Sequence, residues 1–195
     1  MKKMMMVAAT FFLMLNAKAQ KVHFGIKAGM NASSLNYEGN QDMQSKIGFN
    51  AGLLAHIHTG NEFWAFQPEV YYSSEGAKSK SNSDNKRDLG YINVPVLIQY
   101  MFNNGFRLEA GPQVGFLMSA KNKDGGNSTD IKNDLNSAVF SIPLGLGYLT
   151  TTGLGFDARY NFGISNIYKE SSSKVHSNVF QFDIFYQFSG PKVNR

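Results

Sequence analysis

Two pairs of oppositely charged residues stand within otherwise uncharged stretches of the sequence, and a single position separates the members of each pair. Arg107 stands two before Glu109, and Asp157 stands two before Arg159. Residues two apart on an extended strand point to the same side, so each pair would share one face. Two kinds of chemistry fit such pairs in a narrow interior. The charges could neutralise one another as a structural network, or they could pass protons or ions.

Other charged residues fall on the same polar rows of the strand pattern described below. If successive strands run in opposite directions, all of these charged residues lie in the same half of the fold. We favour a paired network that fills the interior, because buried charges need partners. The predicted lumen charge network comprises Lys27, Glu69, Arg107, Glu109, Asp157, Arg159 and Asp183.

Metal and catalytic chemistry have little support. His56 and His58 could share a metal ion, but a solvated polar pair near a rim is the simpler interpretation. The loop 121–134 contains three aspartates without the spacing or closing glutamate of an EF-hand, so we expect a solvated loop. Nucleophile-elbow, zinc-protease and phosphate-loop motifs are absent from the sequence. We therefore predict no enzyme, no cofactor and no metal.

The first residues resemble a signal peptide. Lys2 and Lys3 precede an apolar run from Met4 to Leu15, and Ala17-Lys18-Ala19 fits the small-x-small cleavage pattern. The run is too short to span a membrane comfortably as a helix. We predict a signal peptide over 1–19, a single mature domain over 20–190 and a short tail over 191–195.

Composition excludes several classes of protein. The 195 residues contain no cysteine, which rules out disulfides and thiolate metal sites. The formal charge of +5 falls when the signal peptide leaves, since 16 basic and 14 acidic residues remain, and this weak excess does not predict nucleic-acid binding. Many aromatic and glycine residues with only 17% charged residues suit a β-rich chain.

Apolar and polar residues alternate along eight long segments, as they do in half-exposed strands. In the clearest segment, Phe106, Leu108 and Ala110 alternate with Arg107 and Glu109. Leu54 interrupts the polar row of the second segment. The predicted strands span about 22–33, 46–58, 63–76, 89–102, 106–119, 137–148, 154–165 and 180–188.

The connections alternate between short and long. Short turns are expected at 59–62, 103–105 and 150–153, and long polar loops at 36–45, 78–88, 122–135 and 168–177. Short turns at one rim and long loops at the other are typical of outer-membrane barrels, with the long loops outside the cell. The pattern predicts an all-β, eight-stranded, antiparallel, up-and-down transmembrane β-barrel.

Size decides which row faces inward. An eight-stranded barrel has room only for side chains, and the apolar row would overfill it. The glycine-rich polar row fits the interior, so the apolar row should face lipid. Four prolines argue against continuous strands, because each removes a ladder donor. We expect bulges or ladder breaks at Pro68, Pro95, Pro112 and Pro143.

Several phrases of the sequence resemble the PorT-like outer-membrane β-barrel family. They are Gly25-Ile26-Lys27-Ala28-Gly29-Met30-Asn31, Gln67-Pro68-Glu69-Val70-Tyr71-Tyr72, Tyr91-Ile92-Asn93-Val94-Pro95-Val96-Leu97, Glu109-Ala110-Gly111-Pro112-Gln113-Val114-Gly115 and Ala158-Arg159-Tyr160-Asn161-Phe162-Gly163. The resemblance covers nearly the whole mature chain in order. It implies the same barrel, with prolines tolerated at these positions, but it implies little about activity.

Three hypotheses for function follow. The leading one is a non-enzymatic scaffold in the outer membrane of a Gram-negative cell, with lipid around it and a protein partner at the extracellular loops or the periplasmic rim. The second is a narrow transport conduit through the lumen. The third is a soluble secreted calyx that holds a small apolar ligand.

Overall fold

The strands form one closed, up-and-down ring. The computed structural model describes residues 22–37, 43–60, 62–79, 85–169 and 175–188. The predicted signal peptide and the C-terminal tail lie outside the described residues. The strands are β1 (Val22–Tyr37), β2 (Met43–His58), β3 (Trp64–Ser79), β4 (Lys86–Met101), β5 (Phe106–Ala110), β6 (Gln113–Asp124), β7 (Asn127–Asp130), β8 (Ala138–Leu149), β9 (Leu154–Gly163) and β10 (Val175–Gln187).

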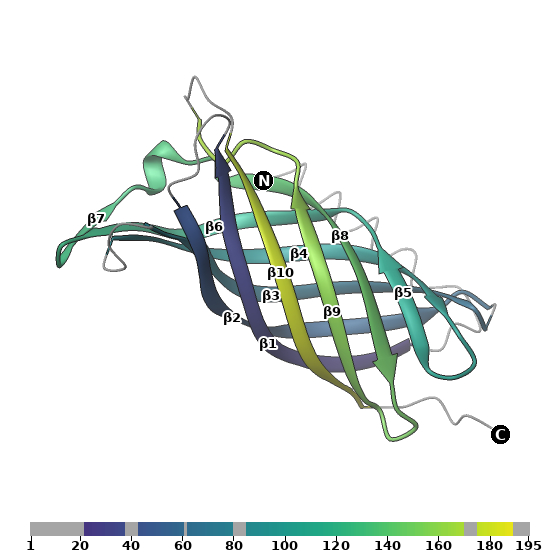
Figure 1. Ribbon diagram of the computed structural model, residues 1–195. Coiled ribbons are helices and arrows are strands. Elements are labelled where there is room, and N and C mark those ends of the chain that lie inside the picture. The colour runs from purple at the N-terminus through teal and green to yellow at the C-terminus, as the bar shows by residue number, and fades with distance from the viewer. Residues whose placement is uncertain (1–21, 38–42, 61, 80–84, 170–174, 189–195) are drawn as a thin grey trace.

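Antiparallel pairing between β1 and β10 closes the ring (Figure 1). Because β5 and β6 lie in the same place between β4 and β8, the wall has eight strand positions. The fold class predicted from the alternation is therefore confirmed. In the part of the chain described here, no helix has the length and hydropathy needed to cross a membrane.

The direction of the alternation is also as predicted. Large apolar side chains are exposed around the whole wall, with Phe24 64% and Leu53 58% exposed. The neighbouring polar row is buried, with Asn50 and Arg159 each 1% exposed. A continuous exposed apolar surface of this kind marks a membrane or protein interface. Lipid around the wall would remove this apolar surface from contact with water.

The ladder is interrupted at each of the four prolines. Pro112 separates β5 from β6, and its carbonyl oxygen accepts a hydrogen bond from the Val96 N–H at 3.0 Å. Pairs are also missing beside Pro68, Pro95 and Pro143, although the pairs on either side keep the same alignment. The expected ladder breaks are thus confirmed. The register shifts lie elsewhere, between Ser45 and Asn50 and between Gly90 and Tyr91.

The strands extend further into the long-loop end than the alternation indicated. The predicted loop 122–135 contains the end of β6, the short strand β7 and a 3-10 helix, η2 (Lys132–Asp134). β10 begins at Val175 rather than near 180. The register shift at Gly90 leaves Ser119 exposed, although its place in the alternation predicted an inward position. These additional strand residues are mostly polar, so they lack the alternation used to predict strands. A sheet that water reaches on one side needs apolar residues only on its other face.

Glycines in the inward row make room for large lumen side chains. A Cβ atom placed on Gly155 would collide with the ring of Phe185, which is 1% exposed. The aromatic ring therefore occupies the space that any other residue at position 155 would need.

We expect Gly155→Ala to lower the free energy of unfolding by about 1–3 kcal/mol, because the ring must move within a packed interior. Urea unfolding of the barrel in lipid vesicles measures this loss. The double variant Gly155→Ala/Phe185→Leu should recover part of it, because the smaller side chain frees the space. Equal losses in the single and double variants would contradict the steric explanation.

Candidate functional site

Arg159 is the centre of a buried charge cluster in the lumen. Its Nη1 and Nη2 atoms each donate to one carboxylate oxygen of Glu69 at 2.8 Å. Nε pairs with Glu109 and lies 3.1 Å from Oδ1 of Asp157, and Nη2 also donates to Oδ2 of Asp157 at 3.2 Å. A guanidinium suits this position because its fork of donors can serve several carboxylates at once. One cation therefore holds three acidic residues, which come from β3, β5 and β9.

Lys27 adds a second cation to the same cluster. Its Nζ atom lies 3.1 Å from Glu69 and 2.6 Å from Asp183. The ammonium also sits 4.8 Å from the ring centroid of Tyr71, a favourable cation–π distance. Side-chain amides donate further hydrogen bonds to three of the four carboxylates, whereas Oδ1 of Asp157 accepts no hydrogen bond from the described residues. These donors are Gln67 to Glu69, Gln99 to Glu109, and Asn50 and Gln181 to Asp183.

Arg107 is the predicted member that the structure does not join to the cluster by an ion pair. Its guanidinium lies 4.2 Å from the ring centroid of Phe185, and the residue is 2% exposed. Within the described part of the chain, none of its guanidinium nitrogens has a hydrogen-bond partner. The structure therefore brings six of the seven predicted residues into direct contact. The ring of Phe185 positions the seventh residue, Arg107, and the alternation could not predict this contact.

The cluster lies in the half of the lumen nearest the short turns, which we call the short-turn end. Its members are all 4% exposed or less, so the charges are neutralised by one another rather than by solvent. Two cations, Lys27 and Arg159, and four carboxylates are joined by ion pairs and hydrogen bonds, and Arg107 lies against Phe185 beside them, so the cluster can fill and brace the lumen. This chemistry needs no nucleophile and no cofactor.

Three of the four histidines, His23, His56 and His58, lie close to this end, and the prediction of a solvated pair is wrong for His56, which is only 1% exposed. The rings of His56 and His58 are perpendicular with centroids 4.7 Å apart, and His23 lies 5.7 Å from His58. Among the residues described, no group of three or more His, Cys, Asp or Glu side chains could hold a metal ion. In the loop segment, Asp130 instead accepts a hydrogen bond from the Lys132 backbone N–H at 2.8 Å.

An apolar cluster at the opposite, long-loop end of the lumen was missed by sequence reasoning. Leu89, Tyr91 and Leu117 occupy inward positions on β4 and β6, and Leu135 and Ile167 come from the connecting segments. The signal was available, because these residues break the polar row or stand alone in polar loops. The full cluster comprises Leu35, Ala77, Leu89, Tyr91, Leu117, Ala120, Leu135, Ile167 and Val175.

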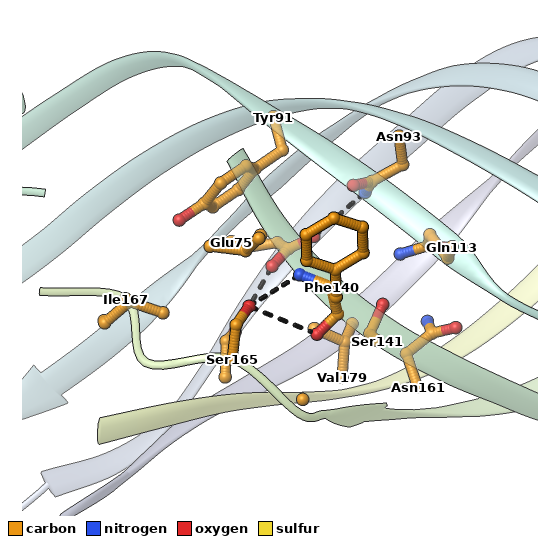
Figure 2. Close-up of a pocket in the computed structure, with 13 residues that line it drawn as sticks. Glu75, Tyr91, Asn93, Gln113, Phe140, Ser141, Asn161, Ser165, Ile167 and Val179 are labelled. Atoms are coloured by element: carbon orange, nitrogen blue, oxygen red, sulfur yellow. Dashed lines mark hydrogen bonds between the residues drawn. The ribbon is translucent and has the colours of Figure 1, made fainter. Parts of the chain in front are cut away.

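A small cavity of about 20 Å³ separates the apolar cluster from the charge cluster. Figure 2 shows Glu75 among the residues that line it. Asn93 donates a hydrogen bond to Glu75 at 3.2 Å, and Ser177 donates another at 3.3 Å. The hydroxyl of Tyr91, which also lines this cavity, has no hydrogen-bond partner in the described residues. A volume of this size accommodates about one water molecule. It is too small for an organic ligand.

The family of the chain follows from comparison with known proteins. Residues 18–169 match the model of the outer membrane protein beta-barrel domain. The chain belongs to this family. No curated protein matches the sequence.

Solved structures of outer-membrane proteins have the same fold. Neisserial surface protein A is 17% identical, with a TM-score of 0.59 over 85% of this chain and 97% of that protein. Ail of Yersinia pestis, solved with the heparin analogue sucrose octasulfate, is 18% identical, with a TM-score of 0.53 over 86% and 99% of the two chains. At these identities the likeness concerns the fold alone. Family and fold together indicate an outer-membrane barrel surrounded by lipid.

Proposed function

We propose that this outer-membrane barrel is a non-enzymatic scaffold with a closed lumen, which presents its long-loop end to a partner outside the cell. The observation that carries the proposal is the double filling of the lumen. Charged residues occupy the short-turn half, and an apolar cluster fills the long-loop half. Between them the cavity holds about one water molecule. Eight strands enclose little more than their side chains, so a path for solutes would require both fillings to move.

Orientation and export belong to the same proposal. The short turns between β2 and β3, β4 and β5, and β8 and β9 suit a periplasmic rim, and the longer connections suit the extracellular side. We also infer export through the N-terminal signal peptide, and membership of the PorT-like group from the phrases quoted above. Heat-modifiability of the protein in isolated outer membranes tests closure and location together.

A closed lumen predicts the absence of conduction. We expect the purified barrel in planar lipid bilayers to give no stable conductance steps, because both fillings block the lumen. An open porin recorded in the same bilayer provides the positive control. Arg107→Ala should leave the record unchanged, since Arg107 holds none of the ion pairs of the cluster. A stable conductance that Arg107→Ala abolishes would overturn the scaffold proposal in favour of a conduit.

A further inference from the structure

Three lysines lie side by side on adjacent strands at the long-loop end. Lys78 of β3 is directly opposite Lys86 of β4, and Lys86 is directly opposite Lys123 of β6. We call these three residues the lysine row. Like charges placed directly across a strand pair destabilise a sheet. An anion bound between them would remove this cost.

Among the residues that the structure describes, neighbouring carboxylates compensate only Lys123 of the row. Asp88 pairs with Lys123 at 2.9 Å and with Lys46 at 2.8 Å. Partial burial favours the neutral form of Asp88, but hydrogen bonds from these two lysines outweigh burial and hold the pKa of Asp88 below its usual value. Asp88 therefore remains charged, and its carboxylate is already paired with Lys46 and Lys123. In the described part of the chain, no carboxylate lies within ion-pair distance of Lys78 or Lys86.

A hollow lies next to the row. It has a volume of about 470 Å³ and is lined by Lys86, Lys123 and the turn residues Gly125, Gly126, Asn127 and Ser128. Gly125 and Gly126 have φ values of +54° and +94°, and the space where their side chains would be is open. No side chain therefore covers the backbone of the turn, and the Gly125 N–H donates to Oδ1 of Asn85 at 3.2 Å. Figure 1 shows that this β6–β7 hairpin projects well beyond the barrel wall.

The lysine row stands above the lipid headgroups. On β3, the apolar outward row ends at Tyr72, six positions before Lys78. Six residues span about 20 Å along a strand, or roughly 15 Å in height at the usual barrel tilt. The headgroup layer on each side of a bilayer is only about 5–8 Å thick. A ligand from solution therefore suits the row better than a phospholipid of the surrounding bilayer.

We propose that the lysine row and its hollow bind a soluble, extended polyanion whose phosphate or sulfate groups bridge neighbouring lysines. Adjacent strands are about 4.8 Å apart, so successive ammonium groups present a regular array to such a chain. The proposal rests on the extracellular orientation of the long-loop end proposed above. It names the class of ligand that this surface takes.

The test is binding of fluorescein-labelled inorganic polyphosphate to the full barrel in phosphatidylcholine nanodiscs, followed by fluorescence anisotropy. The test variant is Lys78→Gln/Lys86→Gln. Its matched control is Lys121→Gln/Lys132→Gln, which removes the same charge from exposed lysines outside the row. We expect the row variant to bind roughly fivefold more weakly, as two exposed ion pairs allow, and the control variant to bind within about twofold of wild type. Unchanged heat-modifiability confirms that each variant is folded.

Three outcomes would overturn the proposal. The first is an equal loss of polyphosphate affinity in the two variants, which would mean a diffuse charge effect. The second is that the wild-type barrel binds polyphosphate no more strongly than it binds labelled dextran. The third is that added phosphatidylglycerol stabilises the barrel in a way that depends on the lysine row, while polyphosphate does not bind. Conductance of the same preparation reports separately on the closed lumen. If the barrel conducts and binds polyphosphate, only the scaffold proposal is contradicted. If the barrel gives no conductance and does not bind polyphosphate, only the lysine-row proposal is contradicted.

Discussion

Replacing Arg159 with methionine is expected to lower the free energy of unfolding of the barrel by about 3–5 kcal/mol. Methionine keeps an unbranched stem but removes the cation that holds Glu69, Glu109 and Asp157. Four carboxylates then share the buried interior with Lys27 and with the guanidinium of Arg107, which has no hydrogen-bond partner in the described residues. Urea titration in lipid vesicles measures the loss, with the single tryptophan, Trp64, as the fluorescent reporter.

Matched variants separate charge from packing in this experiment. Arg159→Met/Glu109→Gln should be more stable than Arg159→Met alone, because one uncompensated carboxylate is removed. Arg159→Lys should lose less than Arg159→Met, since it keeps the charge but not the forked donors. The exposed residue Lys121 supplies the control, and Lys121→Met should stay within about 0.5 kcal/mol of wild type. A wild-type value for Arg159→Met would contradict a bracing role for the cluster.

The sequence was sufficient to predict the barrel because its strands obey one simple constraint. Most inward residues are small or polar, and most outward residues in the middle of the wall are apolar, so a period of two persists over most of every strand. The same alternation places Glu69, Glu109 and Arg159 on inward rows before any contact is known. Their mutual contacts depend on neighbouring strands and register, which the sequence pattern does not specify.

Three features escaped this reasoning for physical reasons. The apolar cluster mixes residues from strands and polar loops, and no local period links Leu89 to Leu135 and Ile167. The hairpin that contains β7 is solvated on both faces, so its sequence lacks alternation. Arg107 was placed on the correct row, but its aromatic partner, Phe185, is an apolar residue within another polar row.

Together these features give the lumen two different fillings with different responses to change. The charge cluster is a network of fixed donors and acceptors in which each member depends on the others. The apolar cluster tolerates conservative changes of similar volume, because its contacts are non-directional. Substitutions in the short-turn half should therefore be less additive than those in the long-loop half.

An arginine at the lipid-facing middle of β8 should destabilise the barrel by about 2–4 kcal/mol in a bilayer. Leu144 is the position of choice, because it is 48% exposed and lies midway along its strand on the outward row. The same change at Ala138, on the same face at the long-loop end of β8, should cost no more than about 1 kcal/mol, since the penalty declines toward the interface. Unfolding of Leu144→Arg and Ala138→Arg in vesicles gives both values under one condition. Equal costs at the two depths would contradict a lipid-facing outward row.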